Sequence, residues 1–159
     1  MKADSTLTHT TVAPESLSNQ LQYQTVAQGV QSLTMEGADL NALAEQFGTP
    51  LYVYSAQHII DAYQAYAQAC EGLADATICY AVKANSNIHI LSLLAQQGAG
   101  FDIVSAGELA RILAAGGNPA KAVFAGVGKT SDEIRFALEK GVGCFNVESV
   151  FDGRKVEYE

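Results

Sequence analysis

From residue 56 onward the chain alternates helical patterns with short apolar runs, and this alternation restricts its fold more than any other feature. Helices are predicted at 56–71, 87–97, 106–115 and 131–140, and strands at 77–82, 101–104, 122–125 and 144–148. Strands separated by helices of about ten or more residues must pair in parallel. The sequence therefore predicts an α/β fold, either a doubly wound sheet or a (β/α)8 barrel, and periodicity alone does not choose between them.

Other patterns precede this alternation. Apolar and polar residues alternate within 20–36, which is typical of a β-hairpin. A helical pattern follows over 39–47, and Gly48 and Pro50 are expected to end it. The apolar run at 51–54 predicts another strand directly afterwards.

The two ends of the chain have a different character. The first segment is rich in Ser, Thr and Ala without periodicity, as expected of a disordered leader. Near the other end, an Asp-Gly pair between short alternating runs predicts a turn. The expected organisation is a leader at 1–19, a hairpin at 20–36, an α/β domain at 37–149 and a tail at 150–159.

The charge and hydropathy of the chain argue against two classes of partner. Its 17 acidic and 9 basic residues give a net charge of -8, whereas nucleic acids and anionic membranes are bound by basic surfaces. The sequence has no apolar run of membrane-spanning length, and its N-terminus lacks the apolar stretch of a signal peptide. We therefore expect no nucleic acid, no membrane and a cytoplasmic location.

Motifs for metal or nucleotide binding are incomplete. The three cysteines form no C-x-x-C pair, and the three histidines have no spacing typical of paired metal ligands, so no metal site is expected. The sequence GVGKT at 126–130 is similar to the end of a phosphate-binding loop. That loop requires a glycine where this chain has Val123, which argues against a nucleotide site.

One lysine has a position that suits covalent chemistry. Lys83 follows the predicted strand at 77–82 and precedes a helix, where poor hydration would favour the neutral amine over the ammonium. A neutral amine can attack an aldehyde. Spacing by itself is more typical of a lysine that ends a strand and extends its charge into water, so wider context must decide.

Several longer blocks around Lys83 supply that context. They are GTPLYVYS at 48–55, YAVKANSN at 80–87, FDIVSAGELARILAAG at 101–116, VFAGVGKTSDEI at 123–134 and CFNVES at 144–149. In this order they resemble the pyridoxal-phosphate-dependent decarboxylases with an alanine-racemase-like barrel, and within them the diaminopimelate decarboxylases. The resemblance covers roughly residues 20–149.

The resemblance implies a fold and an activity. The chain would supply about five of the eight strands of a (β/α)8 barrel, whose catalytic groups lie at the carboxyl ends of the strands. Its hairpin would join a C-terminal β-domain, and its tail departs from the family pattern. The implied reaction is decarboxylation of meso-2,6-diaminopimelate to L-lysine, a step of lysine biosynthesis, by a homodimeric enzyme with pyridoxal 5'-phosphate.

The resemblance also implies roles for particular residues. Lys83 would bind the cofactor covalently, and Ala81 would lie on the pocket wall beside it. Asp102 and Glu108 would belong to the polar network behind the cofactor. Each carboxylate has an alternative role outside the site. Asp102 could cap the next helix, and Glu108 could be a solvated helix residue.

Other functions remain open at this point. In the family, a later histidine, a Gly-rich phosphate-binding segment, a glutamate and a cysteine from a partner subunit complete the site, and none of these segments is in the 159 residues. We therefore expect an N-terminal fragment that is inactive by itself. One alternative is a related ornithine, lysine or arginine decarboxylase, and another is a non-catalytic cofactor-binding fragment.

Overall fold

The computed structural model describes residues 20–25, 29, 31–150 and 153. The predicted leader, and nearly all of the predicted tail, lie outside the described residues. The chain divides into two compact units, residues 1–58 and 59–159.

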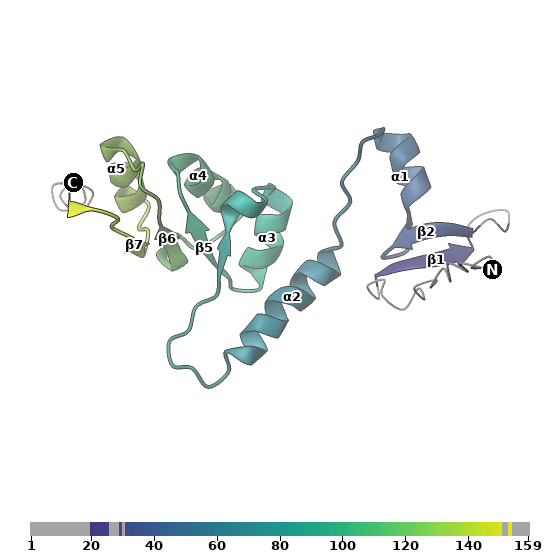
Figure 1. The fold of residues 1–159 in the computed structure, drawn as a ribbon, viewed down its shortest axis with the longest axis horizontal. Coiled ribbons are helices and arrows are strands. Elements are labelled where there is room, and N and C mark those ends of the chain that lie inside the picture. The colour runs from purple at the N-terminus through teal and green to yellow at the C-terminus, as the bar shows by residue number, and fades with distance from the viewer. Residues whose placement is uncertain (1–19, 26–28, 30, 151–152, 154–159) are drawn as a thin grey trace, which may run out of the picture. The chain divides into compact units, whose positions relative to one another are not determined.

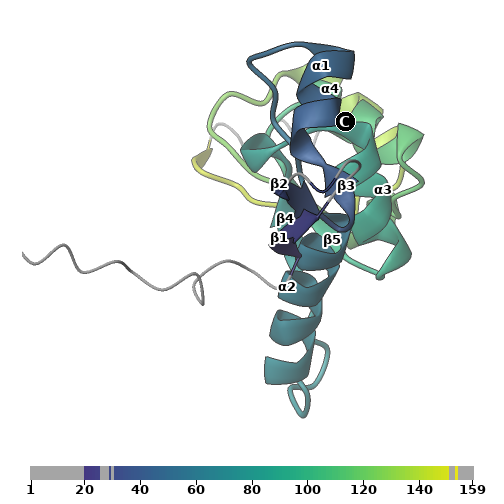
Figure 2. The ribbon, with the colours of Figure 1, turned by 90° about the vertical axis from the view of Figure 1, so that its right-hand side faces the viewer.

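The first unit contains a small antiparallel sheet. Strands β1 (Leu21–Thr25) and β2 (Gln31–Met35) pair with Tyr23 opposite Leu33, which confirms the predicted hairpin (Figures 1 and 2). A two-residue strand, β3 (Ala38–Asp39), returns along β2. It was not predicted, because two residues are too few to show a period of two.

The predicted helix of this unit is also present. Helix α1 (Leu40–Phe47) begins where the Asp39 carboxylate accepts a hydrogen bond from the Asn41 N–H at 3.0 Å. The Ser32 hydroxyl donates to the same carboxylate and lowers the pKa of Asp39. The helix ends at Gly48, whose φ of 82° favours glycine over residues with a side chain.

The strand predicted at 51–54 is wrong. Among the described residues no strand pairs with this segment, which forms an irregular connection between α1 and α2 (Ala56–Ala69) (Figure 1). Tyr52 is 83% exposed. An apolar run becomes a strand only when a neighbouring strand satisfies its backbone N–H and C=O groups, and the sequence of the run does not contain that partner.

The second unit is built on a parallel sheet. Its four strands are β4 (Cys79–Ala81), β5 (Gly100–Ile103), β6 (Ala122–Phe124) and β7 (Cys144–Phe145). They lie side by side in chain order, as consecutive strands of a barrel do, whereas a doubly wound sheet reverses its order at one point (Figure 1). The α/β fold class is confirmed, with four strands in the sheet where about five were expected.

Helices between these strands cover one face of the sheet. They are α3 (Ile88–Gln96), α4 (Ala106–Ala114) and α5 (Ser131–Glu139), all at predicted positions. Phe101, Ile103 and Phe124 point into this helix-covered core and are fully buried. Because side chains alternate along a strand, Asp102 and Val123 lie on the opposite face, where they are only half-buried. No helix of the described residues is long and apolar enough to cross a membrane.

Candidate functional site

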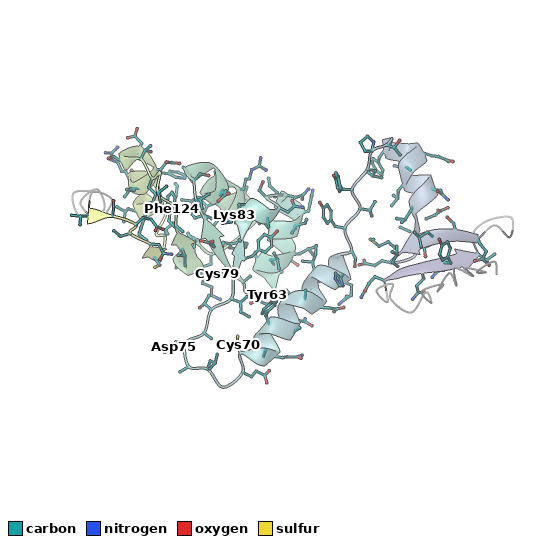
Figure 3. The ribbon with its side chains drawn as sticks, viewed as in Figure 1. Tyr63, Cys70, Asp75, Cys79, Lys83 and Phe124 are labelled. Carbon is teal, nitrogen blue, oxygen red and sulfur yellow. The ribbon has the colours of Figure 1, made fainter. Side chains whose placement is uncertain are left out.

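Lys83 lies at the carboxyl end of the sheet. It is the middle residue of a 3-10 turn, Val82–Ala84, that follows β4 directly (Figure 3). Val82 is fully buried in the core, whereas Lys83 is exposed. The expectation of a poorly hydrated lysine is therefore wrong for the described residues, because the burial of the neighbouring strand does not extend to this side chain.

Two of the other predicted site residues, Ala81 and Asp102, lie in the sheet next to the turn that carries Lys83. Ala81 ends β4, and it is paired with Asp102 in β5, so these two residues are cross-strand neighbours. Burial first, and then the negative charge of Asp102, raise the pKa of the Cys79 thiol. Asp102 therefore acts electrostatically on the face of the sheet that the helices leave uncovered.

Glu108 lies in the first turn of α4, and one oxygen of its carboxylate accepts a hydrogen bond from the backbone before this helix. Glu108 Oε2 accepts a hydrogen bond of 2.7 Å from the Val104 N–H, while the Ser105 hydroxyl accepts one of 3.2 Å from the Glu108 N–H. The two residues thus fix the turn between β5 and α4. This turn follows directly after the strand that carries Asp102.

The segment after Lys83 is ordered by its own asparagines. Asn85 Oδ1 accepts from the Asn87 N–H at 3.0 Å, and Asn87 Oδ1 accepts from the His89 N–H at 2.9 Å. The second contact caps α3. Asparagine favours both conformations because its short side chain reaches backbone N–H groups two residues ahead.

Two residues that the sequence did not indicate also contact this segment. The Tyr80 hydroxyl donates to the Asn85 carbonyl at 3.2 Å, and Arg111 Nη1 of α4 donates to the Ser86 carbonyl at 3.3 Å. No residue spacing in the sequence reveals such contacts, because they depend on how a side chain and a distant carbonyl meet after folding.

Glu133 joins two helices at the same end of the sheet. Its carboxylate accepts hydrogen bonds from the Ala106 N–H of α4 at 3.0 Å and from the Thr130 N–H before α5 at 3.1 Å. The hydrogen bond from Ala106 is the main reason why the pKa of Glu133 is lowered. The spacing of Thr130 and Glu133 is that of a capping box, and this signal was available in the sequence.

Lys129 is buried, in contrast to the exposed Lys83. It is 1% exposed, and its ammonium donates to the carbonyls of Gly126 and, at 2.8 Å, Asn146. The lysine of the GVGKT segment thus joins the loop after β6 to the residue that follows β7. Among the described residues, no group of three or more His, Cys, Asp or Glu side chains is arranged to hold a metal ion.

Comparisons with known proteins show the family of this chain. Residues 56–159 match the family described as "Pyridoxal-dependent decarboxylase, pyridoxal binding domain". Diaminopimelate decarboxylase of Pseudomonas aeruginosa is 62% identical over 117 residues, which cover 74% of this chain and 28% of that protein. This chain therefore spans less than a third of the length of that relative.

Two solved decarboxylase structures are also similar to this chain. The structure of diaminopimelate decarboxylase from M. jannaschii in complex with L-lysine has a TM-score of 0.78 and 34% identity, over 88% of this chain and 32% of that one. A lysine/ornithine decarboxylase from Vibrio vulnificus, in complex with putrescine, has a TM-score of 0.67 and 28% identity, over 75% of this chain and 32% of that one.

Proposed function

Because this chain belongs to the pyridoxal-dependent decarboxylases, through their pyridoxal-binding domain, we propose that it is part of an enzyme that converts meso-2,6-diaminopimelate to L-lysine and CO2. The observation that carries this proposal is the high identity to relatives named diaminopimelate decarboxylase. The complex of one structural neighbour with L-lysine, the product of the proposed reaction, supports the same substrate.

The residues of this chain fit a pyridoxal cofactor. Lys83 presents an exposed primary amine at the end of the sheet where barrel enzymes bind their substrates. Lys129 is buried, and Lys121 lies just before β6, at the opposite end of the strands, where it donates to the Gly98 carbonyl at 3.0 Å. Of these three lysines, Lys83 is therefore the best placed for covalent attachment.

Each predicted site residue has a physical role in this proposal. Lys83 Nζ would hold the cofactor covalently through its primary amine. The small Ala81 side chain leaves room beside it, and Asp102, paired with Ala81, supplies negative charge on the same face of the sheet. Glu108 fixes the turn after β5. When bound, pyridoxal phosphate supplies an electron sink for the bond that loses CO2.

Covalent trapping tests the assignment of Lys83. The chain is incubated with pyridoxal 5'-phosphate, reduced with borohydride, digested and mapped by mass spectrometry. Label on Lys83, and its loss in Lys83→Arg, is the expected result, because the guanidinium stays protonated and cannot replace the amine. Label on Lys121, Lys129 or Lys140 in place of Lys83 would contradict the assignment.

Competition assays on the intact enzyme test the substrate. The expected result is faster CO2 release from meso-diaminopimelate than from ornithine, arginine or lysine. The similarity to the Vibrio vulnificus lysine/ornithine decarboxylase makes a basic amino acid the second candidate substrate. Equal or faster release from one of these amino acids would select it while leaving the role of Lys83 intact.

The proposal extends to the assembly and location of the enzyme. We propose a cytoplasmic homodimer, in line with the family resemblance, and the acidic composition argues against binding of nucleic acid or anionic membranes. Light scattering of the intact enzyme tests the first point. A monomeric mass at working concentrations would exclude the homodimer.

A further inference from the structure

The turn that carries Lys83 has little support of its own. A 3-10 turn of three residues has few internal hydrogen bonds, and their geometry is poorer than in an α-helix. On its N-terminal side it is held by the pairing of Ala81 with Asp102. On its C-terminal side the backbone becomes extended at Asn85, with φ -161° and ψ 111°, so other contacts must hold it there.

Tyr80 and Arg111 supply these contacts on consecutive carbonyls. The Tyr80 hydroxyl spans the turn and reaches the Asn85 carbonyl at 3.2 Å. Arg111 comes from the next βα unit and reaches the Ser86 carbonyl at 3.3 Å. The first contact closes the turn on itself, and the second ties it to α4.

The ring of Tyr80 makes its contact a rigid one. Tyr80 lies in β4, is half-buried and packs against the core, so its hydroxyl projects from a fixed position. The two residues therefore restrict the backbone that follows Lys83, while the pairing of Ala81 with Asp102 holds the backbone before it. Together these contacts limit the direction in which the lysine side chain leaves the backbone. If the backbone around Lys83 is already ordered before the ligand binds, the free energy of binding is not reduced by the cost of ordering it.

We propose that Tyr80 and Arg111 are positioning residues that orient Lys83 for covalent attachment of the pyridoxal group. This inference rests on the proposed function of Lys83. Each contact is a single hydrogen bond at the long end of the usual range. Its loss is expected to lower the apparent affinity of Lys83 for the cofactor by about two- to fivefold.

The test compares variants that remove one polar group each. Tyr80→Phe removes the hydroxyl and keeps the ring, and Arg111→Met removes the guanidinium and keeps most of the stem. The full chain is titrated with pyridoxal 5'-phosphate and reduced with borohydride, and the label is quantified at Lys83 and at Lys140, which ends α5 and serves as an internal reference.

Matched controls come from elsewhere in the same unit. Tyr66→Phe removes a hydroxyl from a tyrosine of α2 that is 69% exposed, and Arg135→Met removes a guanidinium from α5 that bonds Asp132 at 2.9 Å. Neither control is expected to change the labelling of Lys83. Amide hydrogen exchange at 84–87 gives a second readout that does not need the cofactor, and it is expected to accelerate in Tyr80→Phe and Arg111→Met.

The outcomes separate positioning from general destabilisation. A loss of label at Lys83, with unchanged label at Lys140 and faster exchange at 84–87, supports the proposal. Unchanged label at Lys83, or an equal loss at Lys140, overturns it. If Lys83 of the unmodified chain takes no label, the proposed function fails first and the inference fails with it.

Discussion

The carboxylate of Glu133 offers the sharpest test of how the ends of the strands are held together. Glu133→Ala removes the acceptor for the N–H groups of Ala106 and Thr130, and for the Thr130 hydroxyl, which lies 3.0 Å away. A helix cap is worth about 0.5–2 kcal/mol, and a hydrogen bond to a charged group about 1.5–3 kcal/mol when well buried. Glu133 is only half-buried, so we expect a total loss of about 2 kcal/mol in the free energy of unfolding.

Thermal unfolding followed by circular dichroism measures this loss. For a domain of about 60–100 residues, each kcal/mol lowers Tm by about 4–8 °C, so Glu133→Ala is expected to unfold roughly 8–16 °C below the unmodified chain at neutral pH. Glu139→Ala removes an exposed carboxylate from the same helix and serves as the matched control. An equal loss of Tm in this control would refute the reasoning.

The pH dependence of the same experiment has a definite sign. The pKa of Glu133 is lowered in the folded chain, so the folded state binds its proton less readily than the unfolded state does. The stability that this carboxylate contributes is present above the ordinary glutamate pKa and is lost as the pH falls through the lowered value. The Tm difference between Glu133→Ala and the unmodified chain should therefore shrink in acid. A difference that persists unchanged in acid would show that charge is not involved.

Other residues give simpler tests. Lys129→Met removes two hydrogen bonds from a buried ammonium to backbone carbonyls and should lower the free energy of unfolding by about 2 kcal/mol, measured by urea denaturation; an unchanged midpoint would contradict this. Gly143→Ala places a methyl group against the backbone of the turn before β6 and should cost about 3 kcal/mol, whereas Gly128→Ala, which has open space, should cost far less. Exposed Cys144 should react with maleimide before Cys79, because the thiolate is the reactive form and the raised pKa of Cys79 disfavours it; peptide mapping that finds Cys79 modified first would overturn this order.

Much of the α/β unit could be predicted because its signals are local. Apolar residues at helical spacing, followed by short apolar runs, placed α3, α4 and α5 to within a residue or so at each end. Asn87, Ser105 and Thr130 each stand directly before a helix, and each side chain accepts a hydrogen bond from that helix. Lys83 was predicted as the lysine that binds the cofactor because the block around it is contiguous in the sequence, and this role stays a prediction.

The sequence predictions failed where the structure of a segment depends on residues that are distant in the chain. The run at 51–54 has the composition of a strand, but pairing is decided elsewhere. Glu108 was expected in a polar network behind the cofactor; the structure adds that one of its oxygens accepts from the Val104 N–H, while its role in the site stays a prediction.

The sequence by itself determined the alternation of strands and helices from β4 onward and the ends of α3, α4 and α5, because these depend on residues within a few positions of one another. The role of Lys83 in covalent chemistry stays a prediction. Only the tertiary structure decided that β4 to β7 lie in chain order, that Ala81 is paired with Asp102, and that one sheet face is covered by helices. It also decided that Lys129 is buried while Lys83 is exposed. The two lysines have the same chemistry, and their environments differ because the hydrogen bonds and packing around them come from segments distant in the sequence.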